Sequence, residues 1–418
     1  MKMQILHFAD AHIGVETHGK LDSSTGLNTR ILDFVRCLEF IVDTAIERQV
    51  DAVLFAGDAY DYAVPTPTYQ KLFGAQIKRL SDAGIPVVLI VGNHDMPVSY
   101  GRVSPLELFN VLGVPYVYVA ARPKVFKLMT RSGLLQVACL PYPNRSIYLA
   151  REESRSMSEE EITKRIEGIC SDCISAMAKE LSQDAPSVLL AHIAIMGATY
   201  SGSERVVTLG IEPSLMLSAL AMPQFKYVAL GHIHRHQDLN PHSLPHVVYS
   251  GSIERCDFAE ENEPKGFCIV RIDDGEFEFI ETPARRFVTI DVNLHSFRDP
   301  TQALINAISE RNVRDAIVRI RYSCTDEQQA TINWKAIEQA LSEAFRVVSV
   351  VRQVEKQRSR PKAVITEQMD IIEALQRYIE HKDELKELKD ELVKYTRQLE
   401  VELEKRRERS PTKSVSHL

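Results

Sequence analysis

The stretch YVALGHIHRHQ, residues Tyr227–Gln237, raises the first question about this chain. An apolar run typical of a buried strand ends at Gly231, and His232 and His234 follow two residues apart. Residues i and i+2 of an extended backbone face the same way, so the two imidazoles can point into one shared space. A histidine pair alone is more often an ordinary surface feature than a site. Its meaning depends on whether the rest of the chain supplies partners for the imidazoles.

Four other apolar runs also end in residues that can bind a metal ion. With the first, the runs are Gln4–Ala9, Ala52–Ala56, Pro86–Val91, Ser187–Ala191 and Lys226–Leu230. The polar residues that follow them are Asp10, His12, Asp58, Asn93, His94, Asp95, His192, His232 and His234. Five such endings are not expected by chance. Because ligands bind at the carboxyl ends of strands in α/β sheets, the pattern predicts that these residues form one site.

The types of ligand indicate which ions this site would take. Carboxylates, imidazoles and an amide without a thiolate suit manganese, iron or zinc. The set is too large for one such ion and fits two ions that share a bridging carboxylate. Two-metal sites, with the ions about 3.5–4 Å apart, hydrolyse phosphate esters by stabilising both the attacking and the leaving oxygen. The sequence therefore predicts two divalent metal ions, with His232 and His234 serving different ones.

The order of strands and helices predicts the domain organisation. Asn28–Gln49 has helical spacing between the first two runs, and strand–helix alternation of this kind predicts a layered α/β fold over residues 1–280. A small α+β domain follows at 285–352, with strands at Phe287–Val292, Ala316–Tyr322 and Val347–Val351 and helices at Thr301–Arg311 and Trp334–Phe345. Residues 365–409 are predicted to be helical, and 410–418 disordered.

Composition limits the class of protein. The 418 residues carry a net charge of −7, so any contact with a polyanion must use a local patch or metal ions. The seven cysteines show no disulfide-framework spacing, which favours a reducing, cytoplasmic location. No apolar run reaches the length of a transmembrane helix, and the N-terminus does not resemble a signal peptide. We therefore expect a cytoplasmic protein that makes no membrane contact.

The series Asp-x-His, Gly-Asp, Gly-Asn-His-Asp, His and Gly-His-x-His resembles the calcineurin-like metallophosphoesterase superfamily. Its flanks are similar to those of the SbcD-type DNA repair exonucleases, in FADAHIG (Phe8–Gly14), GDAYD (Gly57–Asp61), LPYPNR (Leu140–Arg145) and SGSIERCDFAEENEPKGF (Ser250–Phe267). The resemblance covers residues 1–410 and is only architectural beyond about 285. It implies a layered β-sandwich flanked by helices, a small α+β capping domain, and a C-terminal helical tail that binds an SMC-like ATPase of the SbcC type.

The resemblance also implies a role for each site residue. Asp10, His12, Asp58 and His234 would hold one ion, and Asp58, Asn93, His192 and His232 the other, with Asp58 bridging. His94 would remain free of metal as the catalytic histidine, oriented by Asp95. One departure is Asp61, where archaeal and eukaryotic members have a second histidine. That departure leaves open whether any group besides His94 assists with the phosphate.

The implied activity is metal-dependent DNA cleavage. It comprises a 3′–5′ exonuclease on double-stranded ends and an endonuclease at hairpins, with manganese as the expected ion and a homodimer as the assembly that the family suggests. An alternative is a phosphomonoesterase or cyclic-nucleotide phosphodiesterase with the same dinuclear site. Those enzymes have little use for a capping domain or a helical tail. A non-catalytic scaffold is the third hypothesis, and the presence of every ligand argues against it.

Two other positions carry alternatives that the sequence leaves open. Arg30, just after the first metal motif, could contact a DNA phosphate or form a helix-face salt bridge with Asp33. His7 lies three residues before Asp10 and is interpreted as a packed strand residue rather than a ligand.

The tail shows two apolar stripes whose phase breaks between Ile379 and Leu385. This break predicts two helices, or one bent near His381 and Lys382. The stripes consist of Met369, Ile372, Leu375 and Ile379, then Leu385, Leu388, Leu392, Tyr395, Leu399 and Leu403. A helix exposed to solvent on all sides would not need such an apolar stripe, so each stripe indicates a contact surface. It could close a helical hairpin onto its own domain, or dock on the base of the coiled coil of the ATPase.

Overall fold

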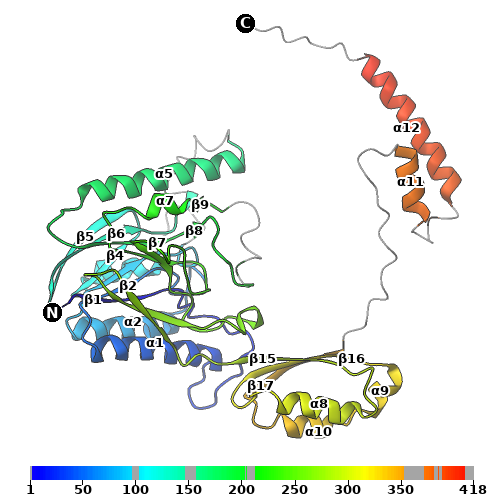
Figure 1. The fold of residues 1–418 in the computed structure, drawn as a ribbon, viewed down its shortest axis with the longest axis horizontal. Coiled ribbons are helices and arrows are strands. Elements are labelled where there is room, and N and C mark those ends of the chain that lie inside the picture. The colour runs from blue at the N-terminus through cyan, green and yellow to red at the C-terminus, as the bar shows by residue number, and fades with distance from the viewer. Residues whose placement is uncertain are drawn as a thin grey trace. The chain divides into compact units, whose positions relative to one another are not determined.

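The computed structural model describes residues 2–96, 103–145, 157–202, 204, 212–352, 371–380, 385 and 388–409. The chain divides into two compact units, Met1–Val351 and Arg352–Leu418. Two six-stranded sheets and one three-stranded sheet build the first unit (Figure 1). A short two-stranded pairing of β8 (Ala194–Ile195) with β9 (Ser214–Leu215) accompanies them.

The first large sheet contains the first three predicted strands as parallel neighbours. Its order is β14-β13-β1-β2-β3-β4, and β13 and β14 run antiparallel at one edge. The bounds are β1 Gln4–Phe8, β2 Ala52–Phe55, β3 Val87–Ile90, β4 Val117–Ala120, β13 Gly266–Arg271 and β14 Phe277–Glu281. The parallel centre directs the carboxyl ends of β1, β2 and β3 to the same edge.

The second large sheet contains the other two predicted strands, again side by side and parallel. Its order is β11-β12-β10-β7-β6-β5, with β5 and β11 antiparallel to their neighbours. The bounds are β5 Lys124–Thr130, β6 Gly133–Leu140, β7 Ser187–His192, β10 Tyr227–Gly231, β11 Gln237–Asp238 and β12 His246–Tyr249. The carboxyl ends of β7 and β10 therefore lie next to each other.

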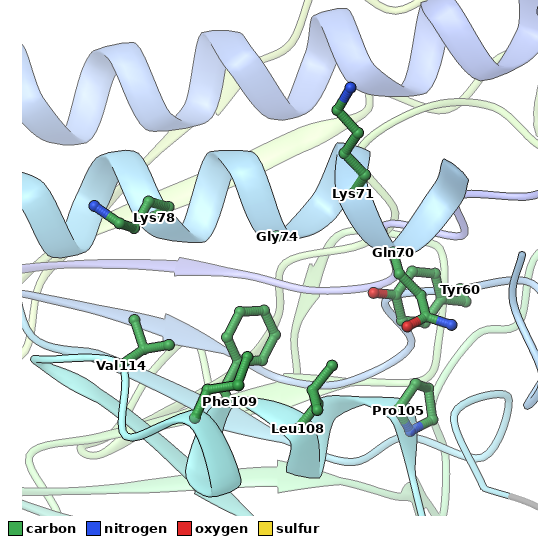
Figure 2. A pocket seen from close by; sticks show the side chains of 10 residues that line it. Tyr60, Gln70, Lys71, Gly74, Lys78, Pro105, Leu108, Phe109 and Val114 are labelled. Carbon is green, nitrogen blue, oxygen red and sulfur yellow. The ribbon is translucent and has the colours of Figure 1, made fainter. Parts of the chain in front are cut away.

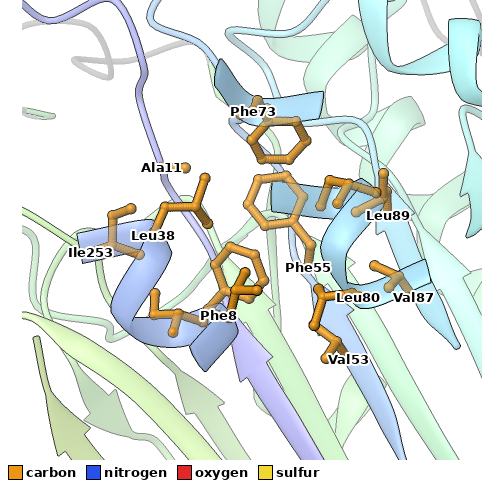
Figure 3. Packing of buried hydrophobic residues seen from close by; sticks show 14 of the residues in the cluster. Phe8, Ala11, Leu38, Val53, Phe55, Phe73, Leu80, Val87, Leu89 and Ile253 are labelled. Atoms are coloured by element: carbon orange, nitrogen blue, oxygen red, sulfur yellow. The ribbon is translucent and has the colours of Figure 1, made fainter. Parts of the chain in front are cut away.

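Three apolar layers hold these sheets and their helices together. One layer lies between the sheets and includes Ile5, Leu54 and Leu190. A second packs the first sheet against α1 (Thr29–Glu47) and α2 (Pro67–Asp82), through residues such as Phe8 and Phe73 (Figure 3). The third packs the second sheet against α5 (Glu159–Glu180) and α7 (Leu217–Leu220). The predicted layered α/β sandwich flanked by helices is confirmed.

Local signals explain where the helices begin. Asn28, predicted as the first helical residue, caps α1 instead, with its side chain accepting a hydrogen bond from the Arg30 amide. Thr66 caps α2, and Pro67 occupies its first turn, where a missing N–H costs nothing. The short helical elements η1 (Pro105–Glu107), α3 (Leu108–Leu112) and η3 (Phe258–Glu260) complete this part of the chain.

The small domain predicted at 285–352 corresponds to a three-stranded sheet with helices packed on it, and it belongs to the first compact unit. Its strands are β15 Phe287–Asn293, β16 Ile317–Ser323 and β17 Arg346–Arg352, and its helices are α8 Pro300–Ser309, α9 Asp326–Thr331 and α10 Trp334–Ala340. It has a core of its own, which includes Leu304 and Ile320. Two details differ from the prediction. Helix α9 was not predicted, and α10 ends at Ala340 instead of continuing to Phe345, because the chain turns there into β17.

A buried ion network joins this small domain to α1. Asp33 accepts hydrogen bonds from Arg30 at 2.7 Å and from Nε and Nη2 of Arg285 at 2.6 Å each. Arg285 also donates to Asp315, between α8 and β16, at 2.7 Å. Arg30 is 0% exposed, which leaves it no access to a DNA phosphate. The salt bridge is therefore the correct interpretation of Arg30.

The second unit contains two helices, α11 (Ile371–Glu380) and α12 (Lys389–Arg409), which contact each other. The two helices agree with the prediction, while the predicted break near His381 and Lys382 lies outside the described residues. Ile379 is buried, whereas Leu388, Tyr395 and Leu399 are 47–65% exposed. Met369 and residues 410–418, on which predictions were also made, lie outside the described residues. Among the residues that are described, no helix is both long enough and apolar enough to cross a membrane.

Candidate metal centre

All nine predicted site residues lie where the carboxyl ends of the two large sheets approach each other. Asp10 and His12 follow β1, Asp58 follows β2, and Asn93, His94 and Asp95 follow β3. His192 ends β7, and His232 and His234 follow β10. The predicted convergence is thus observed, and the strand ends that supply it belong to two packed sheets.

The first group of possible ligands contains Asp10, His12 and His234. One ligand atom from each lies within 4.8 Å of the others, and all three residues are buried. The Nε2 atoms of His12 and His234 are only 3.0 Å apart. Two imidazole nitrogens directed at one point suit a shared cation, because each can present a lone pair to it. Nδ1 of His12 is buried and has no hydrogen-bond partner among the described residues.

The second group contains Asp10, Asp58 and His192, with one ligand atom from each within 4.8 Å of the others, and Asn93 and His232 adjoin it. Nε2 of His192 lies 3.4 Å from Oδ2 of Asp58 and 2.8 Å from Oδ1 of Asn93. Nδ1 of His232 lies 3.0 Å from the same oxygen of Asn93. Oδ2 of Asp58 is also 3.8 Å from Nε2 of His12, in the first group. Asp58 therefore stands between the two groups, where a bridging carboxylate would be needed.

The backbone at this site adopts conformations that side chains other than glycine seldom take. Four site residues have positive φ angles, namely Asp10 at 53°, His12 at 38°, Asp58 at 59° and His232 at 102°. Each such residue costs on the order of 1–3 kcal/mol, and such strain is found mainly at functional sites. Gly92 is required for a different reason, since a Cβ there would lie 2.1 Å from Oδ1 of Asp58. The rest of the fold thus holds these side chains in place against local strain.

Charge is distributed unevenly between the two groups. Burial opposes the ionisation of Asp58, but His192, His94 and His12 hold its pKa well below the usual range. Burial likewise disfavours the protonated form of His192, yet the Asp58 carboxylate outweighs burial and raises the pKa of His192 to about 9. Burial and the nearby His234 lower the pKa of His12. The donor set of carboxylates, imidazoles and an amide, largely shielded from water, fits divalent cations.

His94 also lies beside the possible ligands, since one ligand atom each of His12, Asp58 and His94 lie within 4.8 Å of one another. Its Nδ1 donates to the Asp61 carbonyl at 2.7 Å, and its backbone amide donates to Oδ1 of Asp58 at 2.8 Å. The rings of His94 and His12 meet edge to face, 4.8 Å between centroids. Because Nδ1 is engaged by the carbonyl, Nε2 is the nitrogen that can exchange a proton with a substrate.

The expectation that Asp95 orients His94 is wrong. Asp95 accepts hydrogen bonds from the backbone amides of Ala59 at 3.0 Å, Tyr60 at 3.2 Å and Gly92 at 3.2 Å. Its carboxylate therefore ties the loop after β2 to the loop after β3. Asp95 fixes the backbone that carries Asp58 and Asn93, while the Asp61 carbonyl orients His94.

Acidic residues beside the histidines were not predicted from the sequence, among them Glu204, which accepts from the His234 amide at 2.6 Å. Oε1 of Glu212 lies 2.8 Å from Nε2 of His232, and Oε1 of Glu260 lies 2.9 Å from Nδ1 of His234. None of the three directly follows a parallel strand, so the pattern of strand ends could not reveal them. The only available signal for Glu260 was its place within SGSIERCDFAEENEPKGF.

A separate cavity of about 350 Å³ lies between α2 and α3 (Figure 2). Its lining is mainly apolar and includes Leu108, Phe109 and Leu112, with the lysines Lys71 and Lys78 at its rim. The lining contains no histidine or carboxylate among the described residues. This cavity is therefore no second candidate for the hydrolytic chemistry.

Comparison with known proteins agrees with the geometry. Residues 3–236 match the family model of the calcineurin-like phosphoesterases. The chain is 30% identical over 277 residues to SbcD, one of the subunits of the nuclease SbcCD of Bacillus subtilis (strain 168), covering 66% of this chain and 67% of that protein.

Two solved structures show looser likenesses. A dimetal phosphatase from Danio rerio is 10% identical, with a TM-score of 0.39, covering 65% of this chain and 92% of that one. The sulfate thiohydrolase SoxB of Thermus thermophilus is 11% identical, with a TM-score of 0.33, covering 68% of this chain and 56% of that one. Neither likeness is close enough to define the fold. The family match and the identity to the Bacillus protein, together with the clustered aspartates and histidines, establish that the chain belongs to the calcineurin-like phosphoesterases, as a hydrolase of the SbcD type with a metal site.

Proposed function

We propose that this protein is the nuclease subunit of an SbcCD-like complex and cleaves DNA phosphodiesters with two divalent metal ions. The observation that carries the proposal is the position of Asp58 between two groups of possible ligands. Asp10, His12 and His234 would hold one ion with Asp58, and Asn93, His192 and His232 the other. A shared carboxylate between two such groups is what a two-metal phosphoesterase requires.

The ions, when bound, supply Lewis-acid activation of water and neutralise charge on the phosphate, and manganese is the ion that we propose. The chain supplies the remaining chemistry. Nε2 of His94 would donate a proton to the departing sugar oxygen, since Nδ1 is held by the Asp61 carbonyl at 2.7 Å. Asp95 would keep the loops of Asp58 and Asn93 at a fixed spacing. General acid catalysis of this kind contributes roughly 10²–10⁴-fold to a rate.

The proposed substrate is DNA, cut as a 3′–5′ exonuclease at double-stranded ends and as an endonuclease at hairpins. The name of the Bacillus relative, which describes part of a nuclease, supports a nucleic-acid substrate. We also propose that residues 1–280 form the metal-binding domain and 285–352 a capping domain, an arrangement that would suit DNA because a small-substrate phosphatase does not need a cap. A phosphomonoesterase or cyclic-nucleotide phosphodiesterase remains the alternative for the same metal site.

The proposed partner is an ATPase of the SbcC type, bound through the helical tail at 365–409. The relative is named as one part of a complex, and the exposed side chains of Tyr395 and Leu399 on α12, with Leu388 just before it, leave an apolar face for a partner. A homodimer is proposed from the family resemblance alone. All seven cysteines are free thiols, in keeping with a cytoplasmic location.

The test is cleavage of end-labelled duplex DNA in manganese, magnesium or zinc, with and without the ATPase, beside turnover of a small aryl phosphodiester. We expect manganese-dependent shortening of the duplex from its 3′ ends. The matched variants are His94→Ala and, at an exposed histidine outside the site, His242→Ala. Turnover of the aryl ester with intact duplex under every condition would favour the small-substrate alternative.

A further inference from the structure

Behind His234 lies a buried pair of opposite charges that the proposed chemistry does not use. Glu260 and Lys265 are 0% and 1% exposed. Oε1 of Glu260 accepts a hydrogen bond from Nδ1 of His234 at 2.9 Å, and Oε2 pairs with Nζ of Lys265 at 2.9 Å. Oε2 also accepts from the Cys256 amide at 2.9 Å. Both oxygens of this carboxylate are thus held in place.

Lys265 has a partner for each of its three ammonium hydrogens. Besides Glu260, Nζ donates to the backbone carbonyl of His234 at 3.0 Å and to Oε2 of Glu263 at 3.2 Å. Lys265 therefore binds both the backbone carbonyl of His234 and the Glu260 carboxylate, which contacts the His234 ring. Burial works against the positive charge, but Glu260 and Glu263 keep the pKa of Lys265 above its ordinary value.

A buried ion pair is weak evidence for stability, because removing two charges from water offsets their attraction. Stability alone therefore does not explain the pair of Glu260 and Lys265, whereas its geometry indicates a role in orienting His234. A hydrogen bond at Nδ1 fixes which nitrogen of an imidazole carries the proton, and so leaves the other nitrogen available to a metal. In His234 the nitrogen left available is Nε2, the atom 3.0 Å from Nε2 of His12.

We propose that Glu260, clamped by Lys265, is the positioning residue that directs Nε2 of His234 to one of the two metal ions. The inference rests on the proposed dinuclear site. His192 is oriented differently, by a bond from Nδ1 to the Ala56 carbonyl at 2.6 Å. Because the ligand that Glu260 contacts is His234, its loss should weaken the ion held by Asp10, His12 and His234 and spare the other.

The experiment measures manganese binding to the full-length protein, by titration and by the electron paramagnetic resonance signal of coupled ions. Outer hydrogen-bond partners of metal-ligating histidines are worth about 10–100-fold in metal affinity. We expect Glu260→Gln to weaken one of two equivalents by that factor and to lose the coupled signal at concentrations that saturate the wild type. Lys265→Met should weaken the same equivalent. The control is Glu261→Gln, which replaces the neighbouring carboxylate, a partner of the Thr289 amide at 2.7 Å, and should leave both equivalents unchanged.

Wild-type affinity for both ions in Glu260→Gln would overturn the proposal, and so would equal weakening of both ions. A measurement on the wild type does not depend on whether the variants fold. In the zinc-loaded protein with ¹⁵N-labelled histidines, His234 should be protonated at Nδ1 and bound to zinc through Nε2. Zinc at Nδ1 would overturn the inference.

Cleavage of duplex DNA by the wild type separates this inference from the proposed function. If Glu260→Gln loses one ion while the wild type cuts no DNA, the positioning role stands and the nuclease function fails. If the wild type cuts DNA and Glu260→Gln keeps both ions at full affinity, only the positioning role fails.

Discussion

Replacement of Asp33 by alanine should sharply destabilise the first unit. The Asp33 side chain is 3% exposed, and it pairs with Arg30 and Arg285, whose side chains are 0% and 7% exposed. Its removal leaves two buried guanidinium groups without their closest carboxylate. Breaking a buried pair costs about 3–5 kcal/mol, because an uncompensated charge remains. Arg30 keeps Glu254 at 3.5 Å, and Arg285 keeps Asp315 at 2.7 Å, which favours the lower half of that range.

The assay is urea unfolding of the metal-free protein, with the free energy taken from the first transition. The control is Asp43→Ala on the same helix, where the lost partner is the exposed Arg79. An exposed pair contributes about 0–1 kcal/mol, and the gain in helix propensity on replacing aspartate by alanine is similar at both positions. We expect Asp33→Ala to lose at least about 2 kcal/mol more than Asp43→Ala. Equal losses would refute the view that this network joins the small domain to α1.

Three further predictions concern the site, the core and the tail. His94→Ala should keep both metal ions and DNA affinity while the cleavage rate falls roughly 10²–10⁴-fold, and near-normal turnover would exclude the proton-donor role. Burial lowers the pKa of His7 from 6.5 to about 3, so the unfolded chain takes up a proton before the folded protein does as the pH falls. The contribution of neutral His7 to the free energy of unfolding is therefore complete above pH 6.5 and should shrink by about 2 kcal/mol by pH 5. His7→Gln should lack that part of the pH dependence in urea unfolding, and an unchanged slope would contradict it. Truncation after Pro361 should preserve manganese-dependent turnover of small substrates and greatly weaken ATPase binding, whereas co-purification at full affinity would place the interface elsewhere.

The sequence predicted the parts of the fold in which local pattern and burial agree. Continuous apolar runs mark β1, β2, β3, β7 and β10, because parallel central strands are buried on both faces. The other strands of the two large sheets, parallel and antiparallel alike, were not predicted, and β5 shows one reason. In KVFKLMT only Leu128 is fully buried, so the apolar pattern is weak at this sheet edge.

The site was predicted to the extent that its residues follow strands. The roles of their neighbours were harder to predict, because adjacency in sequence is not adjacency of side chains. Asp95 follows His94 directly, yet its carboxylate binds backbone amides, and a carbonyl of Asp61 takes the role assigned to it. A backbone carbonyl has no sequence signature. Glu260 reaches His234 only through the folding of a loop 26 residues further along the chain.

The most direct test of the dinuclear centre is the number of manganese ions bound by Asp58→Ala, measured by elemental analysis beside the wild type and His12→Ala. Asp58 lies between the two groups of possible ligands, 3.4 Å from His192 and 3.8 Å from His12. We predict two ions in the wild type, weakening of mainly one in His12→Ala, and loss of both in Asp58→Ala. Two full equivalents in Asp58→Ala would contradict the shared centre.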